Sequence, residues 1–158
     1  MKTNAIRLLD QKKIKYQMHD YSATSAISGM EVADALNEDP ATVFKTLVTK
    51  GKCNYYVFLV PVNSELNLKK AAQAVNEKSV EMIKSKELLP LTGYIHGGCS
   101  PIGMKKFFKT VIDESASSQK NIIFSAGKIG YQIETTLDEL HKVIEFSLFD
   151  IKNSRIIC

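Results

Sequence analysis

The chain carries the run Thr42-Val-Phe-Lys-Thr-Leu-Val-Thr49 and, a few residues later, the run Tyr55-Tyr-Val-Phe-Leu-Val-Pro-Val62. Both runs are rich in β-branched and aromatic residues, which favour strands because their side chains pack well on a pleated surface. The segment Gly51-Lys-Cys-Asn54 lies between them. Two strand-like runs joined by a short loop with a glycine predict a β-hairpin.

Helical and strand patterns alternate on both sides of this hairpin. Ser28 and Glu31 have the spacing of a capping box, as do Thr136 and Glu139. The other expected elements, in chain order, are a helix near residues 5–9 capped by Thr3 or Asn4, a strand over 14–18, a helix over 30–36, a helix over 68–75 capped by Asn67, a strand over 80–83, a short helix from Ser85 that stops at Pro90, strands over 107–112, 121–124 and 129–134, a helix from 136 to about 144, and a strand over 145–149. Strands grouped between short helices predict an α+β class with a mainly antiparallel sheet and surrounding helices.

Length and composition indicate one domain over residues 1–158. The chain is 44% hydrophobic and 24% charged, which is ordinary for a globular protein. Charged residues interrupt the first apolar segment, so we expect no signal peptide. No apolar run reaches the ~18 residues of a membrane span, so we expect neither a membrane-spanning segment nor a membrane partner. Cys53, Cys99 and Cys158 are widely spaced, which favours a reducing cytoplasm over a disulfide framework. A net charge of +4 falls short of the basic surface of a duplex-DNA binder, although it suits a brief encounter with another polyanion.

Lys45 is the unusual residue in the first strand of the hairpin. The period of two places Lys45 on one face with Val43 and Leu47, and Phe44 and Thr46 on the other face. A lysine among apolar neighbours either extends to water at a sheet edge or points into a polar cavity. In a cavity, its ammonium would suit a phosphate, a carbonyl oxygen or ribose hydroxyls. The strand pattern leaves both alternatives open.

The segment from Gly93 to Lys106 contains four glycines, a Ser-Pro pair and two adjacent lysines. It lacks the glycine spacing of a P-loop and of a Rossmann turn. Its backbone amides either form an anion-binding nest or serve a tight structural connection. A second turn of small residues, Ser125-Ala-Gly-Lys128, links two of the predicted strands.

The sequence gives little support for a nucleophilic side chain or for a metal site. His19, His96 and His141 have no evident serine or cysteine partner, and His96 lies close to the glycine pair. Cys99 stands alone among small residues, where a thiol is more often inert than reactive. Metal sites need clustered ligands, and the histidine spacing offers none, so we expect neither a metal nor a cofactor.

The order of several short motifs resembles the YbaK/EbsC family. These are Tyr21 after a strand, Val43-Phe-Lys-Thr-Leu47, Asn67-Leu-Lys-Lys70, Thr92-Gly-Tyr94, Gly97-Gly-Cys-Ser-Pro-Ile-Gly-Met-Lys-Lys106 and Ser125-Ala-Gly-Lys128. The family comprises free-standing Cys-tRNA(Pro) deacylases related to the editing domain of bacterial prolyl-tRNA synthetases. The resemblance covers nearly the whole chain and implies a compact, mostly antiparallel mixed sheet, partly barrel-like, with helices around it.

The resemblance also implies roles for particular residues. Lys45 and Gly97 match the catalytic positions, and the substrate-binding positions are matched by Tyr21, Gly98, Ser100, Ser125, Gly127 and Gln132. In this family the thiol of the mischarged cysteine attacks its own ester, so that no side chain forms a covalent bond. The implied partners are the 3′ acceptor end of an aminoacyl-tRNA and prolyl-tRNA synthetase.

Departures from the family pattern keep two other functions open. The turn has Ser-Ala-Gly where relatives often have Ser-Gly-Gly, the loop between Tyr21 and Ser28 is shorter than in some relatives, and Gln132 replaces a residue that is acidic in some of them. One rival is a sister deacylase for another small amino acid, such as alanine, with water as nucleophile. The other is a non-catalytic module that binds tRNA ends or nucleotides.

Overall fold

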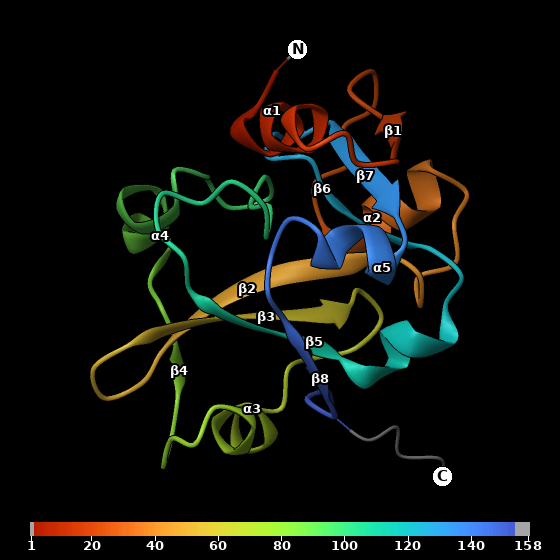
Figure 1. Cartoon of the computed structure of the whole chain (residues 1–158). Helices are drawn as coiled ribbons and strands as arrows, with labels where there is room; N and C mark the ends of the chain where they lie inside the picture. Colours follow the sequence, from red (N-terminus) through yellow and green to blue (C-terminus); the bar gives the residue numbers. More distant parts are fainter. Residues whose placement is uncertain (1, 154–158) are drawn as a thin grey trace, which may run out of the picture.

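The computed structural model describes residues 2–153, arranged as two β-sheets with five α-helices around them (Figure 1). The five-stranded sheet has the order β4 (Glu81–Met82), β2 (Phe44–Lys50), β3 (Tyr55–Pro61), β5 (Lys109–Asp113), β8 (Ser147–Phe149). The three-stranded sheet has the order β1 (Gln17–Asp20), β7 (Tyr131–Thr135), β6 (Ile122–Ser125). The helices are α1 (Asn4–Gln11), α2 (Gly29–Ala35), α3 (Leu68–Ala74), α4 (Ser85–Thr92) and α5 (Leu137–His141), with a 3₁₀-helix over Glu114–Ser118. Together they confirm the α+β class.

The predicted hairpin forms the centre of the five-stranded sheet. β2 and β3 pair antiparallel from Phe44 opposite Pro61 to Lys50 opposite Tyr55. β3 then pairs in parallel with β5, and β5 in parallel with β8, whereas the other strand pairs are antiparallel. The sheet structure is therefore mixed and mainly antiparallel, as expected.

The two sheets meet at the start of β2, where Val43 forms a parallel bridge with Ile123. The Ile123 amide donates to the Thr42 carbonyl at 3.0 Å, and the Val62 amide donates to the Val43 carbonyl at 2.8 Å. Among the described residues this junction does not extend into a closed barrel, so the partly barrel-like shape is only an approximation to two joined sheets.

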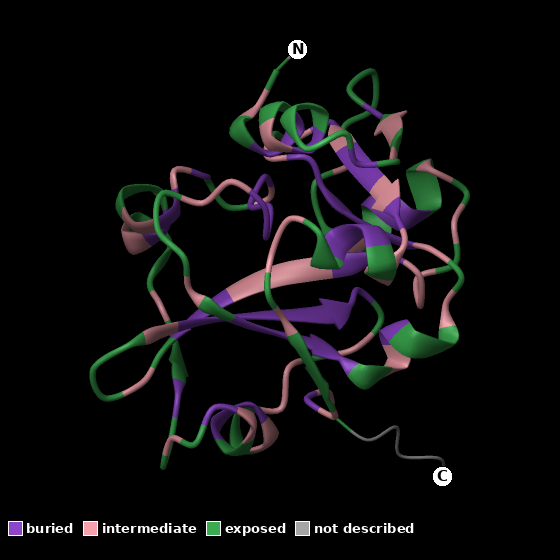
Figure 2. Cartoon of the chain, viewed as in Figure 1, coloured by how far each residue is buried: buried purple, intermediate pink, exposed green. Residues whose placement is uncertain are grey.

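Apolar side chains of β3 divide between two cores, one on each face of the five-stranded sheet. Val57 and Leu59 belong to the core shared with Phe124 and Ile133 of the three-stranded sheet. Phe58 and its neighbours on the opposite face pack against α3. Figure 2 shows β3 buried along nearly its whole length, and in Figure 1 the sheet lies between α3 and the three-stranded sheet. Burial on both faces explains why this strand is a continuous apolar run.

The predicted helix starts are largely correct. The hydroxyl of Thr3 accepts from the Ile6 amide, Asn67 caps α3, and Ser28 and Glu31 form the complete capping box of α2. The second capping box is only half formed. Thr136 accepts from the Glu139 amide, but Glu139 accepts from the Lys15 amide at 2.9 Å instead of returning to its own helix start.

Several predicted boundaries are wrong by two or three residues. β1 begins at Gln17 rather than residue 14, because residues 12–14 close α1: the Ile14 amide donates to the Leu9 carbonyl and Lys13 has a φ of 55°. α4 continues through Pro90 to Thr92, whose hydroxyl donates to the Leu88 carbonyl at 2.8 Å. Buried Leu88 and Thr92 anchor this last turn, so packing outweighs the local cost of the proline.

Strand and helix limits in the last third differ for similar reasons. β5 begins at Lys109, since Phe107 is 67% exposed and lies outside the sheet. α5 ends at His141, β8 begins at Ser147, and the 3₁₀-helix after β5 was not predicted. The predicted limits of β4, β6 and β7 agree with the structure to within two residues. No helix within residues 2–153 has both the length and the apolar character needed to cross a bilayer.

Candidate functional site

A cavity of about 160 Å³ lies where β2, β6 and α2 come together, beside the junction of the two sheets. Its walls come from segments far apart in the sequence. The lining residues are Ile27, Ser28, Gly29, Val32, Val43, Phe44, Lys45, Thr46, Leu47, Val62, Leu88, His96, Gly97, Cys99, Ser125 and Gln132. Apolar walls with a few polar groups are typical of small-molecule sites.

Lys45 reaches this cavity from the uncovered edge of β2. β4 pairs only with Thr49 and Lys50, so no strand within residues 2–153 covers the edge of β2 at residues 44–46. The Lys45 side chain is 27% exposed, and its Nζ lies 3.4 Å from a carboxylate oxygen of Glu65, which is 79% exposed. An ion pair with so exposed a partner contributes only about 0–1 kcal/mol, which leaves the ammonium available to an anionic ligand. Both alternatives for Lys45 thus hold in part: it lies at a sheet edge and lines a cavity.

The glycine-rich segment packs against the turn between β6 and β7. A Cβ atom on Gly98 would lie 3.1 Å from the Ile129 amide nitrogen and 3.2 Å from the Lys128 Cα. Gly97 lines the cavity and has a φ of 85°, which favours glycine. The close approach at Gly98 is therefore to another part of this chain, while Gly97 forms part of the cavity wall.

Ser125 and Gln132 place two polar side chains on the wall formed by the three-stranded sheet. They are opposite each other in the β6–β7 pairing, so their side chains share one face. The Gln132 amide nitrogen lies 3.5 Å from the hydroxyl of Tyr21, which is buried. Gln132 brings no negative charge to the cavity.

The cavity thus includes four of the eight predicted site residues: Lys45, Gly97, Ser125 and Gln132. Tyr21 is held one contact away, through Gln132. Gly98, Ser100 and Gly127 lie outside the lining. Ser100 is fully buried and accepts from the Ile102 amide, and a Cβ on Gly127 would lie 2.7 Å from a ring carbon of Tyr94. The contacts of these three positions are with other parts of the chain.

Comparison with known proteins identifies the family of this chain. The family model of the aminoacyl-tRNA editing domain matches residues 24–143, which is most of the chain. The chain belongs to the aminoacyl-tRNA editing domain family. The matched range contains every predicted site residue except Tyr21.

Individual relatives agree with this assignment of the editing domain. A protein of Enterococcus faecalis named as a Cys-tRNA(Pro)/Cys-tRNA(Cys) deacylase, EbsC, is 47% identical over 135 residues, which cover 84% of this chain and 82% of that protein. The resemblance to the YbaK/EbsC family is thereby confirmed. A proline–tRNA ligase of Thermosipho africanus is 30% identical over 118 residues, and there the match spans 74% of this chain but only 21% of the ligase.

The fold of the editing domain also occurs in solved structures. The crystal structure of a protein described as a trans-editing enzyme for prolyl-tRNA synthetase superposes with a TM-score of 0.83, covering 98% of this chain and 99% of that one. The two sequences are 23% identical, so this match supports the fold alone.

Besides Ser28, which caps α2, three polar residues of the editing domain's cavity were not predicted as site residues. The Thr46 hydroxyl is buried and has no hydrogen-bond partner within residues 2–153. His96 lines the cavity, as its position beside the glycine pair suggested. Cys99 also lines it, but burial raises the pKa of its thiol to about 12, so the sulfur stays protonated and is a poor nucleophile. Thr46 could have been noticed as the neighbour of Lys45 on an open strand edge.

Proposed function

We propose that this protein is a trans-acting deacylase that removes cysteine from mischarged tRNA(Pro), and that Cys-tRNA(Cys) is a second substrate. The observation that carries the proposal is the Lys45 ammonium at a small, largely apolar cavity that also contains Gly97. Membership of the editing family and the name of the E. faecalis relative support it. The reaction belongs in the cytoplasm, where tRNA is charged.

The proposed reaction uses the thiol of the substrate as the nucleophile. The cysteine sulfur attacks its own ester carbonyl, a carbon–sulfur bond forms, and the carbon–oxygen bond to the terminal ribose breaks. The thiol proton ends on the ribose hydroxyl, so the products are a cyclic thiolactone and uncharged tRNA. An aminoacyl ester is already activated, so positioning and charge stabilisation suffice. The protonated state of Cys99 agrees with a mechanism that needs no protein nucleophile.

Four polar side chains at the cavity and the backbone near Gly97 have roles in this proposal. Lys45 binds the 3′ adenosine and opposes the negative charge that develops on the carbonyl oxygen, together with the backbone amide near Gly97. Thr46, whose hydroxyl lacks a partner among the described residues, binds a polar group of the aminoacyl moiety. Ser125 and Gln132 complete the wall around the cysteine. Fit alone separates similar side chains by only ~1–3 kcal/mol, so the reactivity of the thiol supplies further selectivity.

The test measures ester loss from Cys-, Ser- and Ala-tRNA(Pro). Wild type should release cysteine but not serine, which is close in size and lacks the sulfur, and mass spectrometry should detect the thiolactone. Lys45→Ala should lower the rate by about 10²-fold or more, the usual cost of removing one charge-stabilising donor. Lys50→Ala is the matched control, because Lys50 is an exposed lysine of the same strand outside the cavity.

Three results would reject the proposal. Release of alanine in place of cysteine would indicate the sister activity with water as nucleophile. Binding of charged tRNA without turnover would indicate a non-catalytic module. Equal loss of activity in Lys45→Ala and Lys50→Ala would show that the cavity lysine has no special role.

Prolyl-tRNA synthetase is the partner we propose for this deacylase. A net charge of +4 gives modest attraction to tRNA, so a partner that already holds tRNA(Pro) would provide the selection. The related domain inside proline–tRNA ligases supports this pairing. Adding prolyl-tRNA synthetase should raise deacylation of Cys-tRNA(Pro) relative to Cys-tRNA(Cys), whereas an unrelated synthetase should leave the ratio unchanged. An unchanged ratio in both cases would contradict the partnership.

A further inference from the structure

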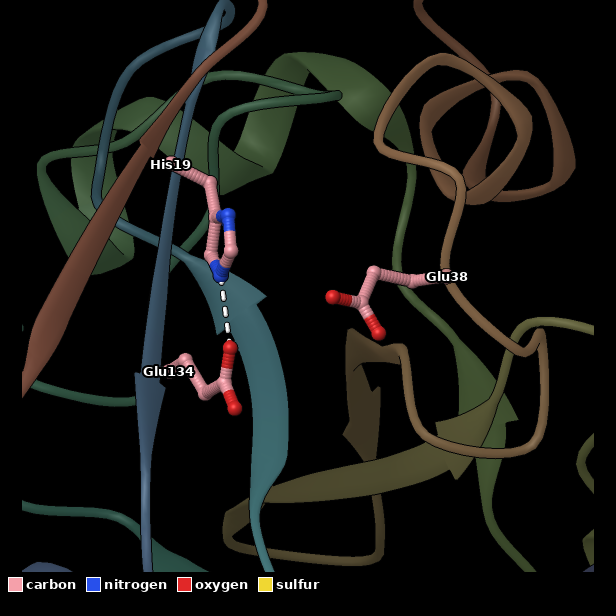
Figure 3. Close-up of side chains that lie close together, drawn as sticks. All are labelled: His19, Glu38 and Glu134. Atoms are coloured by element: carbon pink, nitrogen blue, oxygen red, sulfur yellow. Dashed lines mark hydrogen bonds and ion pairs between the residues drawn. The ribbon is translucent and has the colours of Figure 1, made fainter.

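We propose that His19, Glu38 and Glu134 form a binding site for a divalent ion of a first-row transition metal. Zn²⁺ is the ion used below to test this site. His19 lies on β1, Glu134 on β7, and Glu38 on the loop after α2. One ligand atom from each lies within 4.8 Å of the other two, and Figure 3 shows the three side chains facing one another. The site departs from the expectation of no metal, which considered only the spacing of histidines along the sequence.

Two of the three ligands are already close to coordinating distance. Nε2 of His19 lies 2.7 Å from Oε1 of Glu134, and both side chains are 17% exposed. In the β1–β7 pairing His19 is opposite Gln132, so Glu134 is its diagonal neighbour on the same face. Metal–ligand distances of ~2.0–2.2 Å place adjacent ligand atoms roughly 3 Å apart. A metal ion would therefore require only a slight separation of His19 from Glu134.

A hydrogen bond from outside the cluster holds Glu134 in the right orientation. The Asn121 side-chain amide donates to Oε2 of Glu134 at 2.8 Å, which leaves Oε1 directed at the imidazole. Such bonds to the second oxygen of a ligating carboxylate are a regular feature of metal sites. The orientation of Glu134 is thus fixed without using the atom that would bind the metal.

The charge of the cluster favours a dication. The Glu38 amide donates to the Ala33 carbonyl, but the Glu38 carboxylate has no hydrogen bond or ion pair within the described range 2–153 and is one of the three ligand groups. Two carboxylates beside a neutral imidazole carry a charge of −2, which a divalent ion would balance. One nitrogen and two carboxylate ligands suit zinc and related first-row ions better than Mg²⁺ or Ca²⁺, which prefer oxygen alone.

The site lies beside the cavity but does not form part of it. None of its three residues lines the cavity, whereas α2, the helix just before Glu38, contributes Gly29 and Val32 to the lining. A bound ion would fasten the loop after α2 to β1 and β7. Its role would be to hold the cavity wall in place, and the deacylation chemistry would not pass through it.

Isothermal titration of Zn²⁺ into chelator-treated, dialysed protein tests the site. We expect one ion per chain and a higher thermal unfolding midpoint when zinc is bound. His19→Gln and Glu134→Gln should weaken binding at least 10-fold, and Glu38→Gln should weaken it by a smaller factor. Circular dichroism with chelator present establishes that each variant is folded. Cys53→Ser and Glu81→Gln are controls for an exposed thiol and an exposed carboxylate, and both should bind like wild type.

The absorption spectrum with Co²⁺ identifies the ligands independently. Bands of nitrogen and oxygen coordination, lost in His19→Gln, would support the site. A thiolate charge-transfer band would assign binding to a cysteine and overturn the proposal, as would the absence of saturable zinc binding or equal binding by folded His19→Gln. Deacylation measured with and without chelator is a separate readout, so failure here leaves the proposed function untouched.

Discussion

Cys99 shows at the scale of a single residue how surroundings decide chemistry. A cysteine in a cavity beside a histidine suggests a nucleophile, yet burial raises the pKa of this thiol to about 12. At neutral pH the sulfur is therefore a thiol, which is a far weaker nucleophile than a thiolate.

We expect the deacylation rate of Cys99→Ala to stay within roughly twofold to threefold of the wild-type rate, because the substitution makes only a modest change to the packing. In wild type, a thiol-alkylating reagent at pH 8 should modify exposed Cys53 much faster than Cys99. Peptide mapping after alkylation and a deacylation assay measure the two effects. Rapid alkylation of Cys99, or loss of turnover comparable to that of Lys45→Ala, would show that the sulfur is reactive after all.

Single residues also show what could be predicted from the sequence. Lys45, Gly97, Ser125 and Gln132 were identified from motifs, and all four line the cavity. The meeting of His19 with Glu134 was missed, because it depends on the β1–β7 register and not on spacing along the chain. Glu38 was missed for the same reason.

Helix caps act at the scale of an element, and two of them offer a matched comparison. Ser28 caps α2, which lines the cavity, and Asn67 caps α3, which packs on the far face of the five-stranded sheet. Each cap satisfies one amide at a helix start, so Ser28→Ala and Asn67→Ala should each lower the free energy of unfolding by about 1 kcal/mol. Only Ser28→Ala should also raise KM for charged tRNA. Urea unfolding and steady-state kinetics measure both, and a KM effect in Asn67→Ala alone would contradict the assignment of the cavity.

Glu77 connects three elements and gives a pH dependence. Its carboxylate accepts from the Tyr56 hydroxyl at 2.5 Å and from the Lys52 amide at 3.2 Å, which ties the loop after α3 to the β2–β3 hairpin. The Tyr56 hydroxyl, followed by the Lys52 amide, lowers the pKa of Glu77 below its ordinary value of 4.5. The ionised form is thus favoured by folding, and its stabilisation is present above pH 4.5 and lost as the pH falls through the lower, folded-state value.

Glu77→Gln should therefore flatten the fall in unfolding free energy below pH 4.5. Urea unfolding between pH 3 and pH 7 measures this profile. Glu81→Gln is the control, because Glu81 is exposed on β4 and forms no side-chain hydrogen bond within the described part of the chain. Parallel profiles for wild type and Glu77→Gln would show that these contacts do not persist in solution.

Elements whose signals are local were predicted better than those that depend on packing. The hairpin and the caps of α1, α2 and α3 follow from composition and spacing within a few residues. The continuation of α4 through Pro90 and the late start of β5 depend on which side chains find a buried site. The local sequence near Pro90 and Phe107 does not show which side chains become buried, because their burial depends on segments distant in the sequence.

At the scale of the whole molecule, one core connects the two sheets. Phe44 and Leu59 of the five-stranded sheet share it with Phe124 and Ile133 of the three-stranded sheet, and Leu9 of α1 joins them. The apolar faces that the two sheets turn toward each other are buried only when both sheets are folded. Unfolding should therefore be a single cooperative transition, as for most single domains of this size.

Coincident urea transitions followed by far-ultraviolet circular dichroism and by tyrosine fluorescence would support one domain over residues 1–158. Two separated transitions would show that the sheets unfold independently. Sequence alone predicted the mainly antiparallel pairing but not the division into two sheets, and the single domain over residues 1–158 stays a prediction. The Val43–Ile123 junction brings together segments eighty residues apart, and no local pattern encodes such a meeting.

In the proposed mechanism, the pairing of Lys45 with Val60 makes catalysis depend on strand alignment. Sliding β2 along β3 by one position would turn the ammonium to the opposite side and put an aromatic ring or a hydroxyl in its place. An added residue in the loop at 51–54 favours that shift, because loop length sets the register of a hairpin, whereas one before position 43 leaves the pairing of Lys45 with Val60 unchanged. The deacylation rate is therefore a more sensitive measure of hairpin misalignment than the circular dichroism spectrum of the whole protein.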